Sequence, residues 1–215
     1  MKQKSPLSIE IIPGAYGWAD VRLKIFDDVF EFALSDVCDS IHGLIERVYY
    51  LYPVWQHDNR DHSIMEYGEA DITSTINGTK ETERWYDIPY ASKPLYWDGE
   101  GSYVIWKMKR PLDIKSDFEV TIILEVNQED VSTHTYAIRY SDLCYALAKG
   151  VTEMLLDYGF IGYYETTWME DINLRHFLRI KEIALDTPIA LTDGEHEGVF
   201  HTSLKQELDL LLHPM

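Results

Sequence analysis

Cysteine is almost absent from this sequence of 215 residues, which holds only Cys38 and Cys144. Neither has a CxxC partner or a neighbouring histidine, so we expect structural core thiols, kept reduced in a cytoplasmic protein. Glycine (12) and proline (8) are too few for a collagen-like or low-complexity chain. No apolar run reaches the length of a membrane span, and no apolar signal-peptide region follows the first residues.

Basic residues are also scarce. The 19 lysines and arginines face 37 aspartates and glutamates, which gives a formal net charge of -18. The excess is spread over both halves of the chain, so no acidic tail explains it. A field of this sign disfavours ordinary nucleic-acid binding and anionic membranes. It favours a basic protein partner, whose association the field would steer, although solubility alone is an equally good explanation.

What remains is the composition of a soluble globular protein, with 46% hydrophobic and 26% charged residues. The length predicts a single compact domain over 1–215. Alternating apolar residues predict a hairpin from strands at 19–26 and 29–34, followed by a helix that ends at Pro53. Strands at 102–108, 118–126 and 133–139 precede a second helix that ends at Gly159. Hairpins followed by helices predict an α+β fold, with a mostly antiparallel sheet and helices packed on one face.

A short sequence match relates the two hairpin–helix units. Ser35-Asp36-Val37-Cys38 matches Ser141-Asp142-Leu143-Cys144, and both Ser-Asp pairs are positioned to cap the helix that follows. Apolar residues of the two helices also align at the same offset. The pattern indicates a duplicated β-β-α unit, with pseudo-repeat halves at 1–55 and 100–160, or two unrelated amphipathic helices with common caps.

The last third of the chain is less regular. The aromatic run at 160–167 favours a strand, and the length and spacing of 171–185 favour a helix, although this segment also alternates. Ser203 and Gln206 form a capping-box pattern for a closing helix. That helix is apolar around half its circumference, so it could dock on the body or mediate a dimer; the oligomeric state stays open.

Motifs for enzyme chemistry are largely missing, including nucleophile elbows, phosphate-binding loops and HExxH. The interpretation therefore leans away from an enzyme and predicts no cofactor. The polar loop His57-Asp58-Asn59-Arg60-Asp61-His62 carries the best alternative. Its His57, Asp61 and His62 are proper zinc ligands and partly resemble the metal loop of metallo-β-lactamases, but Asn59 replaces a histidine. This loop supports a metal-dependent hydrolase only as an alternative, and a polar surface loop is the favoured explanation.

One segment concentrates aromatic and acidic side chains. Aromatic side chains offer large contact areas, and carboxylates beside them suit lysine or arginine of a partner. We therefore predict partner-binding residues here, with a second sheet face as the structural alternative. These residues are Trp85, Tyr86, Asp87, Tyr90, Tyr96, Trp97, Asp98 and Glu100.

The leading functional hypothesis is therefore an acidic cytoplasmic module that binds a basic protein. Small immunity proteins, which neutralise basic toxins, are similar in general character, although no motif carries that likeness. A DNA-mimicking acidic inhibitor is a further alternative.

Overall fold

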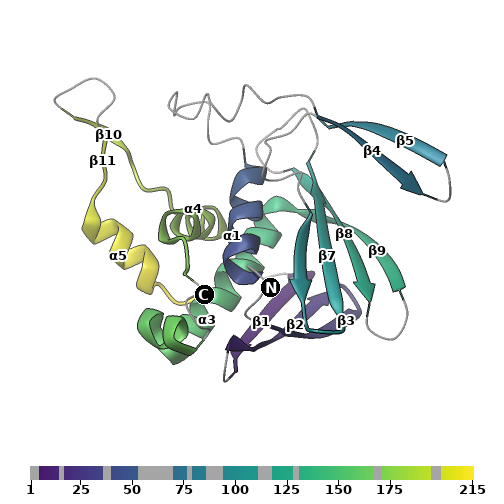
Figure 1. The fold of residues 1–215 in the computed structure, drawn as a ribbon. Helices are drawn as coiled ribbons and strands as arrows, with labels where there is room; N and C mark the ends of the chain where they lie inside the picture. The colour runs from purple at the N-terminus through teal and green to yellow at the C-terminus, as the bar shows by residue number, and fades with distance from the viewer. Residues whose placement is uncertain are drawn as a thin grey trace.

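The computed structural model describes residues 5–14, 17–35, 40–52, 70–76, 79–85, 94–110, 118–127, 131–166, 171–194 and 200–215 (Figure 1). Its elements form an α+β fold of antiparallel sheets with helices packed beside them, as the sequence predicts. The described strands lie in separate small sheets, whereas the sequence suggested one larger sheet. No helix among these residues is both long and apolar enough to cross a membrane.

The first sheet has three strands in the order β1 (Leu7–Pro13), β2 (Ala19–Ile25) and β3 (Asp28–Leu34). Its strands alternate buried and exposed side chains, because successive residues point to opposite faces. Leu23 and Ile25 are fully buried, while Arg22 on the other face pairs with Glu31 of β3 at 3.4 Å. The predicted hairpin at 19–34 is therefore confirmed.

The second sheet has four strands in the order β6 (Leu95–Asp98), β7 (Tyr103–Lys109), β8 (Glu119–Asn127) and β9 (Val131–Arg139). Val120, Ile122 and Leu124 of β8 are fully buried on one face. The hairpin of β4 (Ala70–Ile76) and β5 (Thr79–Trp85) forms a separate pair of strands. A two-stranded pairing joins β10 (Thr192–Asp193) to β11 (Phe200–His201).

The helices among the described residues supply the rest of the core: α1 (Ser40–Leu51), α3 (Tyr140–Thr166), α4 (Leu174–Leu185) and α5 (Leu204–Leu212). They lie together on one side of the sheets (Figure 1). The predicted stripes are buried, since Ile41 and Ile45 of α1 and Leu147 and Val151 of α3 are fully inaccessible. These side chains join the buried faces of both sheets in one hydrophobic core.

The two hairpin–helix units bury matching positions, such as Ile45 and Val151. Any amphipathic helix that follows a hairpin would do so, and the duplication therefore stays a hypothesis. The expected Ser-Asp cap is wrong for the second unit. Helix α3 begins at Tyr140, directly after β9, and Asp142 lies in its first turn, where it accepts a hydrogen bond from Arg139 at 2.9 Å.

The segment at 160–167, predicted as a strand, is helical up to Thr166. Gly159 has the expected positive φ of 66°, but the chain kinks there and the helix resumes. The helix predicted at 171–185 is confirmed as α4, whose N-cap Asn173 accepts from the backbone of His176. Ser203 likewise caps α5 by accepting from the backbone of Gln206 at 3.3 Å.

Candidate protein-binding surface

Only part of the predicted partner-binding segment lies at a described surface. Tyr96 is 58% exposed, and Asp98 and Glu100 are exposed beside it on β6 and the turn that follows. Trp85 ends β5 opposite Ala70, and the structure places its backbone only. Tyr86, Asp87 and Tyr90 lie outside the described residues. We call Tyr96, Asp98 and Glu100 the acidic turn.

Trp97 does not belong to this surface, because it is 1% exposed. Its ring packs edge-on against Trp106 with centroids 4.8 Å apart, and against Phe32 of β3 at 6.1 Å. Alternation along β6 sends Trp97 inward and its neighbours Tyr96 and Asp98 outward. The structural alternative therefore holds for this tryptophan, and a contact role stays a prediction for its exposed neighbours.

Backbone contacts fix the acidic turn to the end of β3. The carbonyl oxygen of Asp98 accepts from the backbone nitrogen of Ser35 at 2.9 Å and from its hydroxyl at 3.1 Å. A Cβ on Gly99 would lie 2.3 Å from the carbonyl oxygen of Ala33, so glycine is required there. Glu100 has a φ of 54° and donates its backbone N–H to the carboxylate of Asp98 at 2.8 Å. The turn thus presents its carboxylates from a fixed backbone.

A partly buried polar cluster, missed by the sequence analysis, joins α1 to α4. His42 and Glu46 lie one turn apart on α1, with the His42 Nε2 3.4 Å from Glu46 Oε1. The Nδ1 atom of buried His176 approaches the same oxygen at 3.8 Å, too far for a hydrogen bond. The spacing of His42 and Glu46 is visible in the sequence, but His176 is brought in only by tertiary packing.

His176 is held as a neutral ring. Arg175 Nη2 lies 3.0 Å from His176 Nε2, so this nitrogen accepts and the proton resides on Nδ1. The ring stacks on Tyr49 at 3.9 Å between centroids. Burial, followed by the nearby charges of Arg175 and His42, lowers the pKa of His176 to about 3. Because burial disfavours the charged form, His176 stays neutral at neutral pH, and its ring contributes packing to the interface of α1 and α4.

A buried lysine holds the last helix in place. Lys181 of α4 is fully inaccessible, and its Nζ donates to the carbonyl oxygen of Leu211 at 2.9 Å. Burial lowers the pKa of Lys181 to about 8. Leu210 is buried as well, so α5 docks on the body as expected. The opposite side of α5 leaves Leu204, Leu208 and Leu212 exposed, and a dimer through this helix stays a prediction.

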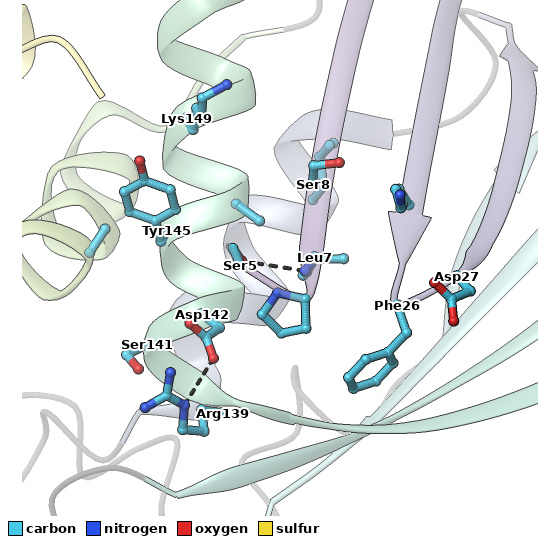
Figure 2. A pocket seen from close by; sticks show the side chains of 15 residues that line it. Ser5, Leu7, Ser8, Phe26, Asp27, Arg139, Ser141, Asp142, Tyr145 and Lys149 are labelled. Atoms are coloured by element: carbon cyan, nitrogen blue, oxygen red, sulfur yellow. Dashed lines mark hydrogen bonds and ion pairs between the residues drawn. The ribbon is translucent and has the colours of Figure 1, made fainter. Parts of the chain in front are cut away.

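A wide groove of about 1040 Å³ lies between the start of β1, the β2–β3 turn and the start of α3 (Figure 2). Its basic side chains are Lys24, Arg139 and Lys149. Arg139 is paired with Asp142 at 2.9 Å and Lys149 with Glu153 at 2.8 Å, which neutralises most of this charge. Tyr145, the serines Ser5, Ser8 and Ser141, the carboxylates of Asp27 and Asp142, and apolar side chains complete the lining. The groove holds no set of side chains that indicates a reaction.

The predicted metal loop at 57–62 lies outside the described residues. Within the part of the chain that the structure describes, no group of three or more histidine, cysteine, aspartate or glutamate side chains could hold a metal ion. His42 is partly buried, with its Nδ1 3.0 Å from the carbonyl oxygen of Asp171.

Comparisons with known proteins give no relative for this chain: no family model, curated protein or solved structure matches it.

Proposed function

We propose that this chain is an acidic protein-binding module that binds a basic protein partner through the acidic turn. The observation that carries the proposal is the exposure of Tyr96, Asp98 and Glu100 on a turn fixed to the core. A rigid aromatic beside two carboxylates matches the side chains that anchor lysine and arginine at protein interfaces.

The charge of the whole chain supports the same partner. A net charge of -18 accelerates encounter with a basic protein and repels acidic ones. An immunity-type inhibitor in the cytoplasm, which neutralises a basic toxin, is the finer form of this proposal. The buried thiol of Cys144 is consistent with a reducing compartment.

The test combines affinity capture from the native host with surface kinetics of each captured protein at low and high salt. Asp98→Asn with Glu100→Gln should slow association at low salt, because it removes two steering charges. Tyr96→Ala should speed dissociation, because it removes the exposed aromatic contact. Asp157→Asn with Glu165→Gln is the matched control, since both side chains are exposed on α3 and the charge change is equal.

Three results would contradict the proposal: a partner that is itself acidic, association indifferent to salt, or equal effects of the two charge variants. Equal effects would show that the general field acts without any local contribution from the acidic turn.

A further inference from the structure

Within the described part of the chain, one strand edge of the second sheet has no partner. Strand β9 pairs with β8 along all nine residues, from Val131 opposite Asn127 to Arg139 opposite Glu119. Among the residues that the structure describes, no strand pairs with its other edge, and β9 lies at the outside of the sheet (Figure 1). About half of its backbone N–H and C=O groups therefore point away from β8 with no strand to receive them.

The edges of the first sheet, β1 and β3, are in contact with other elements. Helix α3 lies against β1, and Gly150 packs closely over the carbonyl of Ile9. The end of β3 is joined to the acidic turn by the bonds from Ser35 to Asp98. Proteins protect exposed edges with charges, proline, bulges or short strands. Strand β9 has none of these between Val131 and Ile138, and its register with β8 is uninterrupted.

We propose that the edge of β9 pairs with β9 of a second copy of this chain, in an antiparallel two-fold dimer. A strand that meets its own copy antiparallel satisfies the outward backbone groups of both, and two-fold contacts are the commonest in homo-oligomers. The result is a continuous eight-stranded sheet across two molecules.

The charge pattern favours a second copy of this chain over a basic protein at the edge of β9. Residues 131–138 contain no aspartate, glutamate, lysine or arginine, so the strand itself carries no carboxylate to attract a basic segment. In a chain with a net charge of -18, a long uncharged edge is where two copies meet with least repulsion. The outward side chains Thr133 and Thr135 are exposed and β-branched, and thus suited to cross-strand pairs.

Apolar side chains beside β9 extend the surface. Phe26 is 49% exposed and its ring lies 6.3 Å from Tyr136 of β9, while Asp28 accepts a hydrogen bond from the Tyr136 hydroxyl at 2.7 Å. Phe26 is presented from a backbone with a φ of 53°, which few non-glycine residues adopt. Val131, at the start of β9, is 62% exposed. A contact through one strand edge and these few side chains belongs to the small interface class, so we expect a reversible dimer.

The experiment is sedimentation equilibrium of the intact chain over a concentration series, at low and high salt. The dimer should strengthen as salt screens the repulsion between two acidic copies. Binding of a basic partner should weaken under the same change, so failure of this proposal and failure of the proposed function are distinguishable. Amide hydrogen exchange of 131–139 should slow as the dimer forms, because the outward N–H groups become bonded.

Thr135→Lys tests the location. It places a charge on the edge while reducing the net negative charge, so general electrostatics alone would strengthen the dimer. We expect it to weaken dimerisation by at least about tenfold. Gln206→Lys on α5, an exposed position with the same charge change, should dimerise at least as well as the wild type. The proposal is overturned by a monomeric wild type, by a Thr135→Lys protein that dimerises like it, or by loss of the dimer in Leu208→Lys alone, which would place the contact on α5.

Discussion

Helix α3 crosses β1 so closely that a Cβ atom on Gly150 would lie 2.4 Å from the carbonyl oxygen of Ile9. The contact joins helix α3 to the first sheet. The two backbones can approach this closely because Gly150 has no side chain between them. In the interior of a helix, glycine ordinarily makes the helix less stable than alanine does, by about 1 kcal/mol. Its presence here is explained by the close approach to β1.

Gly150→Ala should therefore destabilise the fold by about 1–3 kcal/mol, despite its higher helix propensity, because the strand or helix must shift. Gly162→Ala is the matched control in the same helix. Its Cβ would meet only the Cβ of Tyr158 at 4.0 Å, an ordinary contact, so we expect no loss. Urea melts of both variants measure the difference. Equal stability of the two would contradict the close approach.

Trp97→Ala should cost about 3–5 kcal/mol, because it empties a buried site between Phe32 and Trp106. Tyr96→Ala, at the next position, should change the free energy of unfolding by less than about 0.5 kcal/mol, because its ring is exposed. Denaturant melts check the ranking. A stable Trp97→Ala variant would show that this tryptophan does not belong to the core.

Ile45→Ala and Val151→Ala should each destabilise by about 1–4 kcal/mol, because both side chains are fully buried at the middle of their helices. Leu156→Ala on α3 removes a side chain that is 64% exposed, and should have little effect. Thermal unfolding followed by circular dichroism gives the comparison. If Leu156→Ala were the most damaging of the three, the helix faces would be assigned wrongly.

Much of the fold could be predicted from the sequence, because period-two alternation and helical stripes are local signals. The hairpin at 19–34 and the buried helix face through Ile45 can be predicted from neighbouring residues alone. The strand expected at 160–167 is wrong because aromatic residues there suggested a sheet. In the structure the chain turns at Gly159 and resumes as a helix, where Tyr163 is 1% exposed and packs into the core. That packing involves tertiary contacts, which propensity cannot supply.

The candidate surface was predictable only in part. Alternation shows that Tyr96 and Trp97 face opposite sides of β6, but the side that becomes buried depends on Phe32 and Trp106 from other strands. His42 and Glu46 share a helix face by their spacing. His176 reaches them from more than a hundred residues away, and no local pattern could pair it with Glu46.

The same histidine makes stability depend on pH. The pKa of His176 is lowered from 6.5 to about 3 in the folded protein, chiefly by burial. Below pH 6.5 the unfolded chain therefore takes up a proton at this residue that the folded chain refuses. The stabilisation from a neutral His176 is thus complete above pH 6.5 and is lost as the pH falls toward 3.

His176→Phe keeps a flat ring for the stack on Tyr49 and removes the titration. Between pH 6.5 and about 5, the wild type should lose about 2 kcal/mol of unfolding free energy that this variant keeps. Urea melts at closely spaced pH values measure both slopes, within a window above the main titration of the carboxylates. His201→Phe removes an exposed histidine instead and should retain the wild-type slope. Parallel pH profiles for the wild type and His176→Phe would mean that this ring titrates alike in the folded and unfolded chains, and the buried neutral histidine would have to be abandoned.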